Sequence, residues 1–202
     1  MSSTVLYMSM SLDGFIAGPN EGPDNPLGDG GHRLHEWALD TDAERTGSHG
    51  QAPDRLSGTD REVFEEMMST GAVLAGRGTF EPAGGWNGDH HDGIPIFILS
   101  RHEPSPEFAR WPAVTYLVDL ESAVAQAKQA AGDKNVLVHG ASIAQWTLAA
   151  GLLDELQIHL VPVLFGEGRR LFEHLGTEQQ QLEPIRVVQG RDATHLRFRV
   201  RR

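Results

Sequence analysis

Short apolar segments alternate with helical segments along most of this chain, and this alternation constrains its fold more than any single motif. Strands are expected at residues 5–11, 72–75, 94–99, 114–118, 136–138 and 156–164. Helices are expected to begin near 59, to span 120–131 and to span 142–150. Strands that alternate with helices typically form a mainly parallel sheet that is covered on both faces. We therefore predict the α/β class, with a central sheet of that kind.

The C-terminal part of the chain follows a different pattern. Residues 185–200 form two β-prone segments around Gly190-Arg191-Asp192, a sequence typical of a turn. This pattern predicts an antiparallel hairpin at the edge of the sheet. Upstream, Thr59-Asp60-Arg61-Glu62 has the form of a capping box, and Asp119 and Ser142 are placed to begin two further helices.

The length of 202 residues allows one domain with a sizeable core, so we expect residues 1–202 to form a single domain. Residues 18–58 are rich in Gly, Pro, Asp and His, and a segment of this kind is expected to form a long loop or lid. No run approaches the roughly 20 apolar residues of a membrane span. The N-terminus also lacks a signal-peptide pattern. We expect a soluble, cytoplasmic protein with no membrane partner.

The formal net charge of -11 argues against a nucleic-acid partner, because a general phosphate-backbone binder needs a basic face. An anionic small molecule is still compatible with this charge, since local arginines and helix ends can bind it. The chain has no cysteine, which excludes disulfides, thiolate zinc sites and a cysteine nucleophile. The run Asp89-His90-His91-Asp92 is interpreted as a solvated polar loop, because adjacent loop residues rarely converge on one ion. No metal site is expected.

Three expected strands end in corners that suit phosphate groups. The first is Gly76-Arg77-Gly78-Thr79, the second is Ser100-Arg101, and the third runs from Gly140 to Ala144. Glycine allows close backbone approach, helix N-termini present free amides, and arginine pairs with phosphate oxygens. Because ligands of open α/β sheets collect at the carboxyl ends of the strands, these corners predict a nucleotide site, with Ser100 and Arg101 suited to a 2′-phosphate.

The third corner also allows a different chemistry. Gly140-Ala141-Ser142-Ile143-Ala144 loosely matches the nucleophile elbow of serine hydrolases. Ser142 would be the nucleophile, with Asp154 or Asp192 and His195 as partners further along the chain. No oxyanion-hole loop is apparent after an early strand. Both interpretations of Ser142 are open at this point.

Asp13 lies where a glycine interrupts the end of the first strand. Burial there would raise its pKa into a range useful for proton donation, although an Asx-turn that supports Gly14 is an equal alternative. His32 and His35 are spaced as on a helix near Trp37, so they either line a substrate cleft or lie on a surface helix.

Five segments, in order along the chain, together resemble a known family. They are MSLDGFIA (10–17), GRGTFE (76–81), LSR (99–101), GLLDEL (151–156) and PVLFGEG (162–168). The resemblance is to the dihydrofolate reductase superfamily, and within it to the reductase domain at the C-terminus of bifunctional riboflavin-biosynthesis deaminase/reductases. It covers essentially the whole chain except residues 18–58 and implies a dihydrofolate reductase-like fold.

This resemblance implies an NADPH-dependent reductase of a small heterocyclic substrate, such as 5-amino-6-(5-phosphoribosylamino)uracil or dihydrofolate. It also implies a homodimer. Asp13 is expected to be catalytic, and His139 and Trp37 are expected to contact the substrate. The cofactor is expected to lie against Ser9, Ile16 and Ala17 at its nicotinamide end, against Gly76, Arg77, Gly78, Thr79, Gly140, Ala141, Ser142, Ile143 and Ala144 at its pyrophosphate, and against Ser100 and Arg101 at its 2′-phosphate.

The chain departs from the family at the substrate side. Folate reductases carry a Pro-Trp motif and a buried acid after the first strand, where this chain has Asn25-Pro26-Leu27-Gly28-Asp29. Riboflavin reductase domains commonly have glutamate at the position of His139. The substrate is therefore left open. Beside the reductase, a serine hydrolase and a nucleotide-binding module without catalysis are the alternatives.

Overall fold

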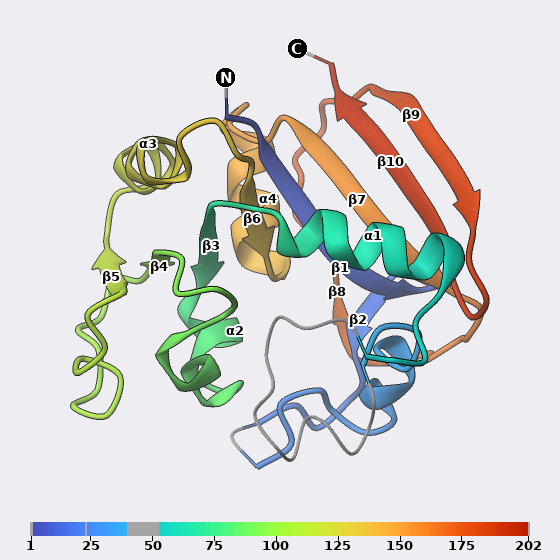
Figure 1. Cartoon of the computed structure of the whole chain (residues 1–202), viewed down its shortest axis with the longest axis horizontal. Helices are drawn as coiled ribbons and strands as arrows, with labels where there is room; N and C mark the ends of the chain where they lie inside the picture. Colours follow the sequence, from blue (N-terminus) through green and yellow to red (C-terminus); the bar gives the residue numbers. More distant parts are fainter. Residues whose placement is uncertain (1, 23, 40–52, 202) are drawn as a thin grey trace.

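The computed structural model describes residues 2–22, 24–39 and 53–201, and an eight-stranded sheet is their central feature. The strands are β1 Thr4–Ser11, β3 Ala72–Gly76, β4 Ile96–Leu99, β5 Val114–Leu117, β6 Val136–His139, β7 Glu155–Val161, β9 Leu182–Gln189 and β10 Thr194–Val200. Their order across the sheet is β5-β4-β3-β6-β1-β7-β10-β9 (Figure 1). Pairing is parallel from β5 to β7 and antiparallel where β10 joins β7 and β9. The predicted α/β class, mainly parallel sheet and C-terminal hairpin are confirmed.

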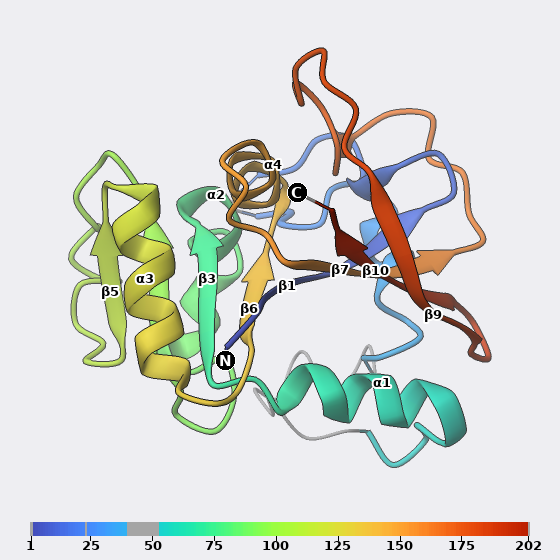
Figure 2. The same cartoon turned by 90° about the horizontal axis from the view of Figure 1, so that it is seen from above.

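Helices cover both faces of this sheet. The α-helices of the described residues are α1 Gly58–Met68, α2 Arg77–Phe80, α3 Leu120–Ala131 and α4 Ala141–Ala149, and the 3-10 helices are η1 Gly31–Leu34 and η2 Gly84–Gly88. Because side chains alternate along a strand, Leu6 and Leu74 pack with α3 and α4, whereas Val5 and Val73 pack with Phe80 of α2 on the other face. Figure 2 shows α1 and α4 on opposite sides of the sheet.

A second, two-stranded sheet joins β2 (Phe15–Ala17) to β8 (Arg169–Arg170) in antiparallel pairing. Of these two strands, β2 follows β1 directly in the chain. The backbone N–H of Leu171, next to β8, donates to the carbonyl of Gly14, 3.0 Å away. The guanidinium of Arg170 also lies over the ring of Phe15, 4.3 Å from its centroid. These contacts fix the chain that leaves β1 against a distant C-terminal segment.

Three expected helix and strand ends can be compared with the structure. The capping-box prediction is wrong: α1 begins at Gly58, and its N-cap residue Ser57 makes no side-chain cap. Asp119 does cap α3, accepting a hydrogen bond from the backbone nitrogen of Ser122 at 2.8 Å. The strand expected to reach residue 164 ends at Val161, immediately before a proline that cannot donate to the sheet.

The stretch between β2 and α1 packs on the core through a few apolar side chains. Leu34, Trp37 and Leu56 are buried there against Phe64 of α1. Residues 40–52 lie outside the described residues, so the expected lid over 18–58 stays a prediction. Within the described ranges, no helix is both long and apolar enough to span a membrane.

Candidate functional site

The carboxyl ends of the parallel strands meet at one edge of the sheet. In the register, Ala75 pairs with His139, and Gly76 pairs with Leu99. The corners that follow β3, β4 and β6 therefore lie side by side. This juxtaposition is the one that the strand order of an open α/β sheet predicts for a ligand site.

Gly140 brings the β6 and β3 corners into direct contact. It adopts φ +102°, and a Cβ atom at this position would stand only 2.2 Å from Oγ1 of Thr79. Neither α2 nor α4 has a side chain that caps its first-turn amides. Gly76 and Gly78 face open space at the same edge. Two uncapped helix N-termini thus converge, with their amide donors available to an anion.

Ser142 lies inside the first turn of α4 and does not cap it, because Gly140 is the N-cap residue. The expectation that Ser142 begins the helix as its cap is therefore wrong by two positions. The side chains of Ala141, Ile143 and Ala144 are buried in or near the core. Ser142 is the exposed residue of this turn.

Arg77 is held at the edge by an ion pair. Its Nε donates to Oε2 of Glu81 at 2.8 Å, and the Tyr116 hydroxyl donates to the other oxygen of Glu81 at 3.3 Å. Burial and the neighbouring Glu81 carboxylate raise the pKa of Tyr116, so it stays a donor. Arg77 therefore enters the site with one side of its guanidinium already paired.

Ser100 and Arg101 form a tight turn at the end of β4. The Ser100 hydroxyl donates to the carbonyl of His102 at 2.7 Å and accepts from its backbone nitrogen at 3.0 Å. Arg101 is exposed beside it. A fixed turn that presents an exposed cation suits a phosphomonoester at the rim of the site.

Asp13 does not have the environment that we expected. Its carboxylate accepts hydrogen bonds from the Ser11 hydroxyl at 2.6 Å and from the backbone nitrogens of Phe165 and Gly166. The Ser11 hydrogen bond, with support from these amides, lowers the pKa of Asp13 to about 2. The prediction of a raised pKa is wrong, since hydrogen bonding to the charged form outweighs desolvation here. Asp13 instead joins the end of β1 to the loop after β7.

Ser9, Ile16 and Ala17 are all buried where β1 and β2 approach this loop. The Ser9 hydroxyl accepts a hydrogen bond from Nε1 of Trp37 at 2.9 Å. A Cβ atom at Gly168 would stand 2.1 Å from the carbonyl oxygen of Ala17, so backbones pack closely here. Any contact of these three residues with a ligand would be made mainly by backbone groups.

His139 is a neutral side chain at the end of β6. Its Nδ1 lies 3.1 Å from the carbonyl oxygen of Tyr7, to which it donates, so Nε2 carries the free lone pair. Burial lowers the pKa of His139. The rings of Trp86 and His90 stand 6.1 and 6.3 Å from its ring. This places an imidazole acceptor within an aromatic cluster next to the glycine corner.

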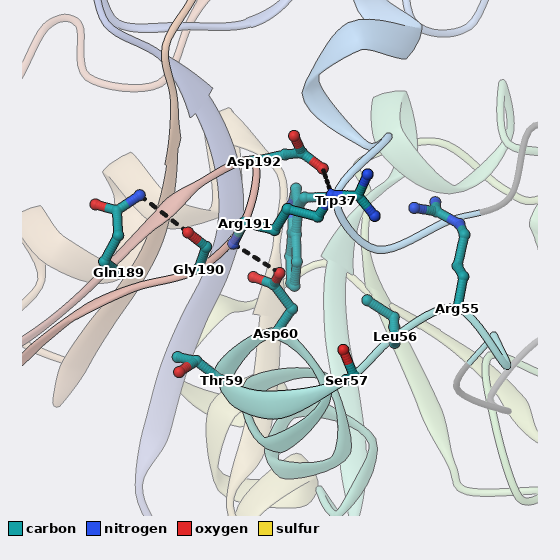
Figure 3. A pocket seen from close by; sticks show the side chains of 10 residues that line it. All are labelled: Trp37, Arg55, Leu56, Ser57, Thr59, Asp60, Gln189, Gly190, Arg191 and Asp192. Carbon is teal, nitrogen blue, oxygen red and sulfur yellow. Dashed lines mark hydrogen bonds and ion pairs between the residues drawn. The ribbon is translucent and has the colours of Figure 1, made fainter.

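Sequence reasoning missed a second polar group, which lies beneath α1 and includes Trp37. The Trp37 ring stands 4.3 Å from that of His159 and 4.8 Å from that of His195, and Nε2 of His195 lies 2.8 Å from Oδ1 of Asp60. Figure 3 shows Trp37 and Asp60 lining one cavity, whose volume is about 110 Å³. One signal in the sequence could have indicated this group. Asp60 lies four residues before Phe64, so a carboxylate occupies the apolar face of the helix, where a buried partner is expected.

Comparison with known proteins places this chain in a family. The model of the RibD C-terminal domain matches residues 3–196. The chain belongs to this family. A search of curated proteins gave no match.

Solved structures agree with the RibD C-terminal domain assignment. A candidate riboflavin biosynthesis protein from Shewanella sp. PV-4 matches with a TM-score of 0.71 and 21% identity, over 99% of both chains. RibD of Acinetobacter baumannii matches at 0.59 and 16%, and this chain spans 59% of its length. Dihydrofolate reductase from Enterococcus faecalis, in complex with NADP(H), matches at 0.58 and 14%, over 98% and 96% of the two chains. At these identities the likeness shows the fold, which is dihydrofolate reductase-like as expected.

The serine hydrolase alternative receives no support from a RibD C-terminal domain with this geometry. His195, the histidine that it requires, faces Asp60 and His159 and not Ser142. Asp154, its first candidate acid, pairs with Lys128 at 2.7 Å.

In the 89–92 loop, Nδ1 of His90 lies 2.7 Å from Nδ1 of His91. Among the described residues, no group of three or more His, Asp or Glu side chains could hold a metal ion.

Proposed function

We propose that this RibD C-terminal domain is an NADPH-dependent reductase of a small heterocyclic substrate. The observation that carries the proposal is the contact between Gly140 and Thr79, which brings two uncapped helix N-termini to one edge. A diphosphate fits this edge, since several backbone N–H donors and no side-chain cap converge there. The family membership and the NADP(H) complex of the Enterococcus reductase give independent support.

In this proposal each corner has one task. Gly76, Arg77, Gly78 and Thr79 hold the pyrophosphate from one side, and the first turn of α4 holds it from the other. Ser100 and Arg101 bind the 2′-phosphate, and backbone groups of Ser9, Ile16 and Ala17 lie along the nicotinamide and its ribose. When bound, NADPH supplies a hydride. The residues listed here bind and orient, and the lone pair of His139 faces the substrate side.

Asp13 has a different role in this proposal from the one first expected. A carboxylate with a pKa of about 2 is not a proton donor near neutral pH. We assign it the task of holding the 165–166 backbone at the end of β1, and so of keeping the nicotinamide end of the site in shape.

A titration of the protein with NADPH and NADH, followed by tryptophan and nucleotide fluorescence, tests the proposal. We expect micromolar affinity for NADPH, and failure to bind at micromolar concentrations would exclude the reductase. Oxidation of NADPH is then followed with ribosylaminopyrimidines, dihydropteridines and quinones. Turnover of none of them would favour a binding module without catalysis.

Arg101→Ala tests the 2′-phosphate assignment. Because NADH lacks this phosphate, we expect the substitution to weaken NADPH by about tenfold, close to the value of one charge-assisted contact, and to leave NADH unchanged. Arg110→Ala, in the same connection between β4 and β5, is the matched control, and it should alter neither affinity. An equal loss for both nucleotides would contradict the assignment.

We further propose that residues 1–202 act as one domain and form a homodimer. Light scattering coupled to size exclusion measures the mass directly, and a monomeric mass of 22.1 kDa would contradict the dimer.

A further inference from the structure

Three buried side chains from three separate elements form a hydrogen-bonded chain beneath α1. Asp60 of α1 meets Nε2 of His195 of β10 at 2.8 Å, and Nδ1 of His195 meets Nδ1 of His159 of β7 at 2.9 Å. Their exposed fractions are 5%, 0% and 2%. The proposed cofactor edge uses none of them.

The hydrogen bonds of this buried chain all run in one donor-to-acceptor direction, which follows from counting its donors and acceptors. Oδ2 of Asp60 accepts from the backbone nitrogen of Arg191 at 2.9 Å, so both carboxylate oxygens act as acceptors. His195 must then carry its proton on Nε2, which leaves a lone pair on its Nδ1. His159 must donate from Nδ1 to that lone pair. Every hydrogen in the chain therefore points toward Asp60, and Nε2 of His159 is left as an acceptor.

That acceptor has no partner among the described residues. Nε2 of His159 is fully buried and makes no hydrogen bond. A buried polar atom of this kind needs an explanation, because a phenylalanine would fill the space without the loss of hydration. Asp60 and His195 are two further buried polar side chains, and their hydrogen bonds fix the tautomer of His159. The cost of burying this lone pair is offset if it accepts a hydrogen bond from a donor on a molecule that binds to the protein.

The surroundings of His159 connect it to the proposed active site. It pairs in register with Ser9, whose hydroxyl holds the Trp37 indole against the His159 ring. Beside burial and His195, the nearby imidazoles of His35 and His139 lower the pKa of His159, because two protonated rings would repel each other. His159 is therefore connected through Ser9 and Trp37 to the residues proposed to lie at the nicotinamide and substrate end of the site.

We propose that Nε2 of His159 accepts a hydrogen bond from the substrate of this reductase, with Asp60 and His195 as positioning residues that hold the accepting tautomer. The inference rests on the proposed function. It names the substrate class as a planar heterocycle with a ring N–H, as in a lactam or a cyclic ureide. Since Nε2 is covered, the heterocycle must shift the adjacent Trp37 indole as it binds.

The tautomer is tested first, on the wild-type protein and without any ligand. Long-range ¹H–¹⁵N spectra of the histidine rings distinguish a protonated from a bare nitrogen. We expect His159 with a proton on Nδ1 and a bare Nε2, and His195 with a proton on Nε2. Asp60→Asn should mix the two tautomers of His195, because an amide can present either its oxygen or its NH₂ group. A His159 protonated on Nε2 in the wild type would overturn the inference.

Ligand selectivity is tested with lumazine and 1,3-dimethyllumazine, which share one ring system and differ in their ring N–H donors. We expect lumazine to bind at least about tenfold more tightly, to quench Trp37 fluorescence and to shift the ¹⁵N signal of His159 Nε2. Equal affinities overturn the inference, and so does binding of neither compound up to about 1 mM. A water at Nε2 would give the expected tautomer without this preference.

Variants separate recognition from folding. His159→Phe should abolish the preference for lumazine, whereas His159→Gln, whose amide oxygen is again an acceptor, should restore part of it. His174→Gln, at an exposed histidine, is the control and should behave as wild type. A preference that survives in His159→Phe overturns the inference. These measurements need no nucleotide, so a failure of NADPH to bind counts against the proposed function and is distinguishable from them.

Discussion

The edge at the ends of β3, β4 and β6 and the buried chain beneath α1 are built in opposite ways. At the edge, short contiguous segments present backbone groups, and a glycine supplies the contact between them. In the buried chain, single side chains from distant positions meet, with Asp60 and His195 separated by 135 residues and His195 and His159 by 36. The first kind of site is readable in a sequence, and the second exists only in the fold.

The two regions should also respond differently to substitution. Backbone donors persist when most side chains are changed, so the edge is sensitive chiefly where a glycine is required. The buried chain depends on each of its side chains, because removal of one leaves a buried polar partner unpaired. The experiments below compare these sensitivities.

Gly140→Ala should have the largest effect. The new Cβ would overlap Oγ1 of Thr79, and the position has φ +102°, a conformation that costs other residues about 1–3 kcal/mol. We expect the α2 and α4 corners to separate, with NADPH affinity falling by about 100-fold or more, equivalent to about 2.7 kcal/mol. Nucleotide fluorescence measures the affinity, and urea unfolding measures the stability.

Gly151→Ala is the control for backbone strain alone. Gly151 also has a positive φ, of +66°, but a Cβ atom there meets nothing within 4 Å. It should lose stability without loss of NADPH affinity. Similar affinity losses in both variants would show that the contact with Thr79 is not what forms the edge.

Asp60→Ala should destabilise the fold while leaving nucleotide binding nearly intact. It removes the acceptor of both His195 and the Arg191 backbone nitrogen in a buried site, at a cost of about 3 kcal/mol for two unpaired donors. Asp192→Asn, at the rim of the same cavity, is the control and should change the free energy of unfolding by less than about 0.5 kcal/mol. Urea unfolding measures both. A loss of NADPH affinity that equals the one in Gly140→Ala would remove the distinction between the two regions.

These two regions explain how far the sequence predicts this molecule. Apolar periodicity predicts the sheet and α3, because those features depend on neighbours along the chain. The glycine corners do follow the strands as expected, and phosphate binding at them stays a prediction. The residues around Asp60 fit the local pattern of a capping box, whereas its partner, His195, lies on the last strand.

The lowered pKa of Asp13 has a local and a long-range cause. The largest is the hydrogen bond from Ser11, two residues away, which depends on side-chain conformations that the residue pattern does not show. The amide donors Phe165 and Gly166 lie far along the chain and are brought near only by folding.

The buried imidazoles should make stability fall as the pH falls. Burial, with His139 and His32, lowers the pKa of His35 to about 4, below the ordinary value of 6.5. The unfolded chain therefore binds a proton first, and the free energy of unfolding decreases between pH 6.5 and about 4. His35→Gln should remove part of this decrease, and His102→Gln, at an exposed position, should not. Urea midpoints at pH 7, 5.5 and 4.5 measure the effect, and identical slopes for His35→Gln and wild type would contradict it.

Asp119→Ala should have the smallest effect, and it isolates a feature that the sequence predicts correctly. The carboxylate accepts from the backbone nitrogen of Ser122 at 2.8 Å, and loss of such a cap costs about 1 kcal/mol. Asp119→Asn keeps an acceptor oxygen and should recover most of that loss. Because the cap is local and exposed, neither variant should change NADPH affinity or the histidine tautomers. A change in either would mean that the stability of α3 is coupled to the site. Local and long-range features of this fold would then not be separable in the way that the two regions indicate.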